Sequence, residues 1–219
     1  MNEKINLIQK VNFFKSLDSA ELEIIQGISN ITKHPKNSIL HYENDIFNKI
    51  FFLASGLLKV YKIDKFDNEI FLYHIYEGSL ISELTTLDTN AIQCFSNSEF
   101  IEDSIILEVD FMELKKMLSR NNTLNTSFIN EVLLKTQQLH CVVNRELVFD
   151  ATAKVAYMLS DDLKMFNSLQ RQEVSFMLHI QPETLSRVLK KLKRSSIIDI
   201  EHNAIVIIDK ESLKKIYRG

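Results

Sequence analysis

The stretch QPETLSRVLKKLKRSS, residues 181–196, carries five cationic side chains and one carboxylate. The whole chain of 219 residues has a net charge of -3, so its overall charge does not account for this local excess of cations. Residues 1–149 hold 14 Lys and Arg against 20 Asp and Glu, whereas residues 150–219 hold 12 against 9. Arginine and lysine pair with phosphates, and arginine also bonds a guanine edge through two hydrogen bonds. The stretch therefore indicates a part of the chain that meets phosphates, with nucleic acid as the first candidate.

Four polar side chains of this stretch fall on one helical face, because positions three or four apart are neighbours on a helix. They are Glu183, Ser186, Arg187 and Lys190. Arg187 can bond the O6 and N7 atoms of guanine, Glu183 can accept from the amino group of cytosine, and Ser186 can contact thymine or a phosphate. Glu183 and Arg187, at i and i+4, can also hold each other's rotamers. Lys190, Lys191 and the two cations that follow suit phosphate contacts, which position a protein without reading the sequence.

An apolar stripe runs along the opposite face of the same helix, and we expect it to face the core of a small domain. It consists of Leu185, Val188, Leu189 and Leu192. A surface helix with solvated charges is the alternative interpretation, and for most runs of charge it is the better one. Here a preceding helix, a tight turn and a following hairpin favour a helix-turn-helix, whose second helix enters the major groove.

The C-terminal residues 150–219 show the order helix, helix, short turn, helix and hairpin, which is that of a winged helix-turn-helix. DATAKVAYMLSDDL predicts the first helix with Asp150 as its N-cap, and RQEVSFMLHI predicts the second. Pro182 suits the first position of the third helix, where a missing N–H costs nothing. IIDIEHNAIVIID predicts two strands around a two-residue turn at His202 and Asn203. The remaining candidate DNA contacts of this domain are Arg171, Gln181 and Thr184.

Between residues 36 and 109 the sequence changes to short apolar runs separated by turn-prone clusters. KIFFLAS, LLKVYKI, EIFLYHIY, QCFSNSEF and SIILEV each predict a strand, and many closely spaced short strands favour an all-β sandwich or barrel. Since the chain has only four glycines, Asn and Asp must supply most tight turns. Residues 1–33 look helical, with a helix start near Ser16 and Asp18. The sequence thus predicts an α+β protein with a β-rich domain over 1–109, a long helix over 110–149 and a DNA-binding domain over 150–219.

The long helix has a predicted break near SRNNT and carries an apolar stripe with alternating spacings of four and three. A long helix with such a heptad-like stripe usually pairs with a copy of itself, which predicts a homodimer. The alternative is a helix packed on its own domain. The stripe consists of Phe128, Val132, Leu139, Val142 and Phe149, with Lys135 and Glu146 filling the remaining seam positions.

Composition and motifs argue against several classes of protein. No apolar run reaches the roughly 18 residues of a bilayer-spanning helix, and the N-terminus lacks a signal-type apolar core, so we expect a cytoplasmic protein without a membrane partner. Cys94 and Cys141 form neither a CxxC motif for zinc or an iron–sulfur cluster nor a disulfide framework. His74 and Glu77 stand without the H-x-H motif of a metal-binding cupin. Because a P-loop, a GxSxG and an HExxH motif are also missing, we expect neither an enzyme nor a metal site.

In several segments the chain resembles the cyclic-AMP receptor and fumarate–nitrate reduction regulator (Crp/Fnr) family. The resemblance covers nearly the whole chain and is carried by IFFLASGLLKVYKID, YEGSLISEL, DATAKVAYML and, most specifically, RQEVSFMLHIQPETLSRVLKKLKRSSII. It implies a cyclic-nucleotide-binding-type β-roll, a dimerisation helix and a winged helix that reads a palindromic promoter. Double-stranded DNA, a second copy of the chain and RNA polymerase are the implied partners. Glu183, Ser186 and Arg187 match the E-x-x-S-R pattern of the fumarate–nitrate branch, which implies a TTGA…TCAA target.

The chain departs from this family at two places. His179 stands in the helix-turn-helix turn where glycine is usual, and His tolerates positive φ less well than glycine does. Cyclic-nucleotide binders of the family carry Gly-Glu and, ten residues on, Arg-Ser. Here Glu83 remains, but Ser82 replaces the glycine, and Gln93 and Cys94 replace Arg-Ser. Losing the arginine removes the cation matched to the phosphate, so we expect no cyclic-AMP binding.

The sequence leaves the effector open. Leu139 and His140 stand where the family's adenine-contacting hydroxyls are expected, the N-terminus lacks the cysteine cluster of iron–sulfur members, and no Cys or His lies around residues 82–84 to match a haem-bound gas sensor. A haem ligated by His140 beside Cys141, a redox thiol, and an apolar or anionic metabolite in the β-roll are the alternatives. A regulator that docks on another protein through its winged helix is the alternative to DNA binding. The effector-site candidates are Glu83, Gln93, Cys94 and His140.

Overall fold

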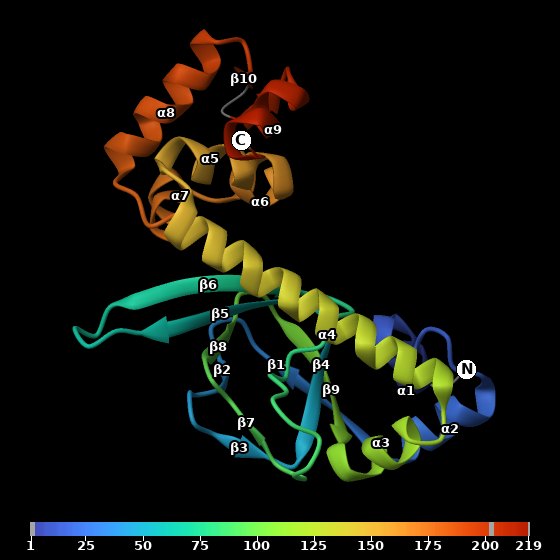
Figure 1. Cartoon of the computed structure of the whole chain (residues 1–219). Helices are drawn as coiled ribbons and strands as arrows, with labels where there is room; N and C mark the ends of the chain where they lie inside the picture. The colour runs from blue at the N-terminus through green and yellow to red at the C-terminus, as the bar shows by residue number, and fades with distance from the viewer. Residues whose placement is uncertain (1–2, 202–203, 219) are drawn as a thin grey trace. The chain divides into compact units, whose positions relative to one another are not determined.

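The computed structural model describes residues 3–201 and 204–218 and divides the chain into two compact units, Met1–Gln138 and Leu139–Gly219 (Figure 1). The turn predicted at His202 and Asn203 lies outside the described residues. Among the residues described, every helix is too short or too polar to cross a membrane.

The first unit begins with short helices and ends in a long helix that continues into the second unit. Asp18 begins α2 as predicted, because its carboxylate accepts the Glu21 N–H at 2.9 Å while the Glu21 carboxylate accepts the Asp18 N–H at 2.9 Å. The predicted break in the long helical segment is confirmed between α3 and α4. The helical elements are α1 (Glu3–Lys10), the 3-10 turn η1 (Asn12–Phe14), α2 (Ser19–Gly27), α3 (Phe111–Leu118) and α4 (Asn122–Val143).

In the described part of the first unit, nine strands form the β-roll, in sheets ordered β1-β9-β4, β2-β8-β5-β6 and β3-β7. Three predicted runs become β4, β5 and β6 with the expected bounds, whereas QCFSNSEF divides between β7 and β8. The helical prediction for residues 1–33 is wrong over β1, because Ile31 and its neighbours pair with β9. The strands are β1 (Ser29–His34), β2 (Ile39–His41), β3 (Ile46–Phe47), β4 (Lys49–Ser55), β5 (Leu57–Ile63), β6 (Glu69–Tyr76), β7 (Ile92–Gln93), β8 (Asn97–Phe100) and β9 (Ser104–Asp110).

Strand β4 lies between the two cores of the first unit, which explains its unbroken apolar run. Ile50, Phe52 and Ala54 join the core shared with the N-terminal helices, α3 and α4. Phe51 and Leu53 alternate with them and face the interior of the roll. A strand with both faces buried needs apolar side chains at every position.

Asparagine and aspartate supply several of the left-handed turn residues, as the shortage of glycine predicted. Asn37, Asn44 and Asp67 have φ values of 65°, 73° and 62°. Two glycines, Gly56 and Gly78, also have positive φ, at 105° and 83°. Short polar side chains therefore take over most of the turn positions that glycine fills elsewhere.

The second unit is a winged helix-turn-helix that also includes the last turn of α4 and a π-helical turn, η2. The Asp150 carboxylate accepts the Ala153 N–H at 2.8 Å and caps α5, as predicted. Two helices, α6 and α9, were not predicted. Each is short and buries a single residue, Phe166 or Leu213, so neither shows a repeated apolar spacing of buried residues. The elements are η2 (Asn144–Val148), α5 (Ala151–Asp161), α6 (Leu163–Ser168), α7 (Arg171–Met177), α8 (Pro182–Arg194), β10 (Ile198–Glu201), β11 (Ala204–Ile207) and α9 (Lys210–Arg218).

Replacing Gly56 with alanine should destabilise the first unit by about 3 kcal/mol, because φ is 105° there and a Cβ would collide with the side chain of Ser104. Urea unfolding of the full chain measures this change. Gly27→Ala is the matched control, since a Cβ at Gly27 meets nothing within 4 Å. Equal stabilities for the two variants would show that the β4–β5 turn does not need glycine.

Candidate nucleic-acid interface

Helix α8 begins at Pro182, preceded by Gln181 in extended conformation with φ -71° and ψ 145°. The missing N–H of Pro182 is one that the first turn of any helix leaves without an internal partner. The predicted apolar stripe is confirmed as buried, and it packs into the core of the second unit with residues of α5, α7, β10 and β11. The buried residues of α8 are Leu185, Val188, Leu189 and Leu192.

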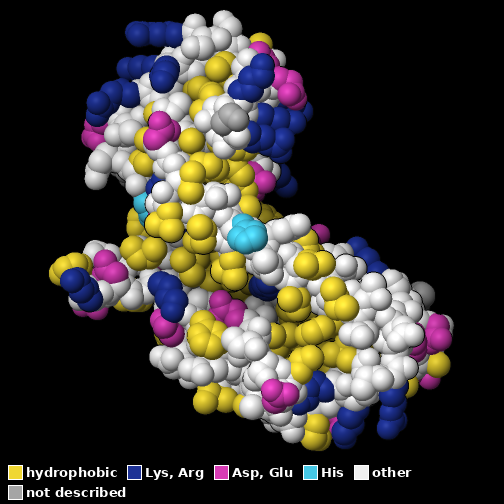
Figure 2. All heavy atoms as spheres, viewed as in Figure 1, with side chains coloured by type: hydrophobic (Ala, Val, Ile, Leu, Met, Phe, Trp, Pro, Cys, Tyr) yellow, Lys and Arg dark blue, Asp and Glu magenta, His cyan; other side chains and the backbone are white. Residues whose placement is uncertain are grey.

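The opposite face of α8 is exposed and carries five of the predicted DNA contacts. They are Glu183, Ser186, Arg187, Lys190 and Lys191. Figure 2 shows Lys and Arg side chains gathered along α8. The Arg187 Nε atom donates to the backbone oxygen of Glu183 at 3.4 Å rather than to its carboxylate, so the two side chains remain separately available.

The other three predicted contacts lie around the start of α7 and α8. Gln181 is exposed and Thr184 is half-buried. The guanidinium of Arg171 lies over the Phe166 ring, 5.0 Å from its centroid, and its Nη1 atom is buried without a hydrogen-bond partner among the described residues. Burial lowers the pKa of Arg171. The ring therefore orients Arg171 while part of its donor capacity stays unused.

A further cation of the stretch serves the domain itself. Lys193 Nζ lies 2.6 Å from Asp199 Oδ1, which joins the last turn of α8 to β10. The hydrogen bond from Lys193, with a second from the Ile200 N–H, holds the pKa of Asp199 below its ordinary value. Lys193 therefore differs from Lys190 and Lys191, for which the described residues show no ion pair.

The turn between α7 and α8 contains a residue in the left-handed conformation, at the position where the sequence has histidine in place of the usual glycine. His179 has φ 51°. The turn is closed by the His179 N–H on the Phe176 carbonyl and the Ile180 N–H on the Ser175 carbonyl, both at 3.0 Å. Histidine is thus accommodated at a position that favours glycine.

The effector-site candidates of the first unit already have partners within it. The Glu83 carboxylate accepts the Phe95 N–H at 2.8 Å and the Tyr73 hydroxyl at 3.5 Å. Burial, assisted by Glu83, raises the pKa of Tyr73. Gln93 is exposed and donates to Asn44 Oδ1 at 3.2 Å. Glu83 and Gln93 are thus each hydrogen-bonded within the first unit.

The two remaining effector-site candidates differ in exposure. Cys94 is buried, and burial, with Glu83 and Asp45 assisting, raises the pKa of its thiol to about 12. His140 lies on α4 in the second unit and is exposed. Of these two candidates, Cys94 is enclosed by the fold and His140 is open to solvent.

Two charged residues, Lys135 and Glu131, lie on the inner face of α4, which packs against the β-roll. The sequence did not indicate that they contact the roll. Lys135 Nζ donates to the Ile81 carbonyl at 3.3 Å, and Glu131 Oε2 accepts the Leu80 N–H at 3.3 Å. Burial lowers the pKa of Lys135 to about 8, although Glu83 and Glu131 act to raise it. Burial raises the pKa of Glu131. Lys135 therefore faces the β-roll and not the helix–helix seam; its i,i+4 spacing from Glu131 was the signal available in the sequence.

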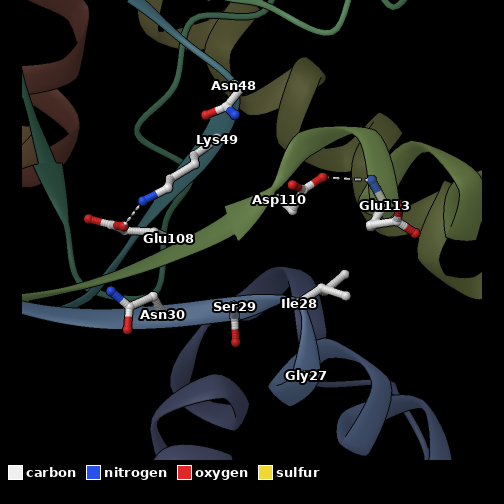
Figure 3. A pocket seen from close by; sticks show the side chains of 9 residues that line it. All are labelled: Gly27, Ile28, Ser29, Asn30, Asn48, Lys49, Glu108, Asp110 and Glu113. Atoms are coloured by element: carbon white, nitrogen blue, oxygen red, sulfur yellow. Dashed lines mark hydrogen bonds and ion pairs between the residues drawn. The ribbon is translucent and has the colours of Figure 1, made fainter.

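A separate cavity of about 370 Å³ lies in the first unit between the end of α2, β1, β4 and the β9–α3 junction (Figure 3). Its lysine, Lys49, pairs with Glu108 at 2.6 Å, and the Asp110 carboxylate caps α3 by accepting the Glu113 N–H at 2.9 Å. These contacts occupy its charged groups in building the fold. Over the ranges 3–201 and 204–218, no group of three potential metal ligands gathers.

Comparisons with known proteins agree with this architecture. Residues 31–121 match the family model of the cyclic nucleotide-binding domain, and residues 153–216 match that of the Crp-like helix-turn-helix domain. An anaerobic regulatory protein of Bacillus subtilis is 20% identical over 86% of this chain and 83% of its own length. A cAMP-activated global transcriptional regulator of Pasteurella multocida is 21% identical over 85% of this chain and 93% of its own. A solved variant of CooA from Carboxydothermus hydrogenoformans shares the fold, with a TM-score of 0.73, 18% identity and 95% of each chain covered.

The Cys94 thiol should resist alkylation in the folded protein, because only the thiolate reacts and a pKa of about 12 leaves very little of it. Incubation with iodoacetamide at mildly alkaline pH, followed by peptide mass spectrometry, measures the modified fraction. The same reaction in denaturing urea is the control and should label Cys94 fully. Rapid labelling of Cys94 in the folded protein would contradict the assigned burial.

Proposed function

Because the chain belongs to the Crp/Fnr family of DNA-binding transcription regulators, we propose that it acts as a homodimer that reads a TTGA-like palindrome through the major groove. We further propose that its effector is not cyclic AMP, and that it works in the cytoplasm beside RNA polymerase. The observation that carries the proposal is the outward face of α8.

The outward face of α8 supports reading of base edges by three side chains. Glu183, Ser186 and Arg187 are exposed at the start of a helix whose opposite face is fixed in the core. In helix-turn-helix proteins these N-terminal residues of the second helix meet base edges. Arg187 suits guanine and Glu183 suits cytosine, so one base pair can be read from both strands. This pairing fits the G·C pair of a TTGA half-site.

An exposed apolar stripe on α4 supports dimerisation. Its members follow the helix at spacings of three and four, with exposed fractions of 52% at Ile129, 41% at Val132, 56% at Leu139 and 49% at Val143. Thr136 completes the repeat. A stripe of this kind is stabilised by burial against a partner helix. We propose this stripe in place of the one predicted from the sequence, since Phe128 packs against the core of the first unit.

The residues around Glu83 support an effector other than cyclic AMP. Gln93 places a neutral, exposed amide where a bound phosphate needs a cation. The Glu83 carboxylate, which would bind a ribose, already accepts the Phe95 N–H. The raised pKa of Cys94 argues against a thiolate sensor at that residue. A haem- or thiol-based sensor and a protein-docking regulator remain the competing proposals, and neither gains a specific supporting contact.

Removing Arg187 should weaken binding to a TTGA…TCAA duplex by about 1–3 kcal/mol and reduce discrimination against a scrambled duplex. Lys191→Ala should weaken both duplexes alike and lower the slope of log affinity against log salt by about one. Fluorescence anisotropy at two salt concentrations measures both effects.

Lys65→Ala, in the β5–β6 turn, is the control for loss of a cation and should leave both affinities unchanged. Saturating cyclic AMP should not alter wild-type binding. If Arg187→Ala keeps the full preference for the palindrome, the assigned reading residue is wrong. Equal wild-type affinity for both duplexes would sink the TTGA proposal.

Leu139→Lys should convert the dimer to a monomer, because it places a charge in the apolar seam of α4. Light scattering during size-exclusion chromatography measures the mass. Gln137→Lys adds the same charge to the same helix off the stripe, and it should remain dimeric. A wild-type protein with the mass of one chain, or an unaltered Leu139→Lys dimer, would refute this seam.

A further inference from the structure

One carboxylate in the second unit collects donors from three elements. The Glu146 carboxylate, in the π-helical turn η2, lies 2.6 Å from Arg145 Nε, 2.9 Å from His179 Nδ1 and 3.5 Å from Lys154 Nζ. Lys154 belongs to α5, and His179 lies in the turn between α7 and α8. The single side chain of Glu146 therefore connects η2 with α5 and with the turn that precedes α8.

This cluster is shielded, so its contacts are worth more than surface ion pairs. The side chains of Arg145 and Lys154 are 12% and 10% exposed, and that of Glu146 is 28% exposed. Burial by itself would raise the pKa of Glu146, yet the hydrogen bonds from Arg145 and His179 hold that pKa below its ordinary value. Glu146 is therefore an anion at neutral pH, and charge-assisted hydrogen bonds are the strong ones.

His179 has two unfavourable features that its contact with Glu146 offsets. Its backbone lies in the left-handed region, where a non-glycine residue is strained. Its Nε2 atom is buried and lacks a hydrogen-bond partner within the described part of the chain. The imidazole is fixed by its bond through Nδ1, which donates to Glu146 Oε2 at 2.9 Å. A glycine would form the same turn without this tether.

We propose that His179 is a positioning residue for DNA recognition, which acts by fastening the helix-turn-helix turn to η2 through Glu146. This inference rests on the proposed function. The first turn of α8 begins three residues after His179, so a fixed turn fixes the direction from which Glu183 and Arg187 approach DNA. A second bond fastens the end of α4, just before η2, since the Tyr157 hydroxyl donates to Cys141 Sγ at 2.9 Å. The end of α4 is thereby bonded to α5, as η2 is bonded to the turn before α8.

The test replaces His179 with glycine, which removes the tether while relieving the strained backbone. We expect affinity for the TTGA…TCAA duplex to fall about tenfold, within the usual range of couplings between sites, while stability to urea is kept or raised. The salt dependence should not change, because no phosphate contact is lost. Ser196→Gly is the matched control: Ser196 has φ 54° just beyond the other end of α8, and relieving it should leave affinity unchanged.

Glu146→Gln, alone and combined with His179→Gly, separates a tether from a loosened backbone. If the tether acts, the double variant should bind about as weakly as the weaker single variant, because both changes remove the same bond between His179 and Glu146. Additive losses, or an unaltered affinity of His179→Gly, would overturn the proposal.

Hydrogen exchange of the free protein keeps this test distinct from that of the proposed function. His179→Gly should speed amide exchange over residues 144–148, with Ser196→Gly unchanged. If the wild type shows no preference for the palindrome, the proposed function fails, and the exchange experiment still decides the tether. Unchanged exchange over 144–148 would refute the fastening whatever the DNA result.

Discussion

The burial of one face of α8 is the constraint on which the recognition surface depends. Leu185, Val188, Leu189 and Leu192 lie in the core of the second unit, so the helix has one permitted rotation about its axis. That rotation presents Glu183 and Arg187 to solvent. Arg187 contributes little to holding the helix, as it bonds only to the backbone of its own helix among the described contacts. Packing thus sets the orientation and leaves the exposed side chains free for a ligand.

The cations of the chain fall into two groups, those that are paired within the fold and those that are left exposed. In the second unit, Lys190 and Lys191 are exposed and unpaired within the described residues, which suits a surface that meets phosphates. In the first unit, Lys59 bonds to both Glu69 and Glu99, at 2.8 and 2.7 Å, and Lys135 lies against a backbone carbonyl. Lys190 and Lys191 are therefore available to phosphates although the net charge of the whole chain is -3.

Sequence patterns predicted the elements with strong local signals and failed where tertiary contact decides. The apolar runs of β4, β5 and β6 and the N-caps Asp18 and Asp150 are local, and the structure confirms them. Strand β1 was missed because its pairing with β9 lies about 75 residues away along the chain, as Thr32 and Ile106 show. The apolar spacing of α4 allowed two neighbouring stripes, and only the packing of the β-roll selects which of them is exposed. The tether at Glu146 could not be predicted, because its partners come from separate elements and only the fold brings them together.

Two side chains of α4 bond to the loop that follows β6. Two backbone groups of this loop are bonded to α4: the Leu80 N–H donates to Glu131, and the Ile81 carbonyl accepts from Lys135. A molecule that enters this part of the roll is therefore a competitor of two side chains, and its affinity is the difference between its contacts and theirs. Because those side chains belong to α4, displacing either would also remove one hydrogen bond between the helix and the loop. The affinity of such a molecule and the loss of hydrogen bonds between α4 and the loop would then follow from the same competition.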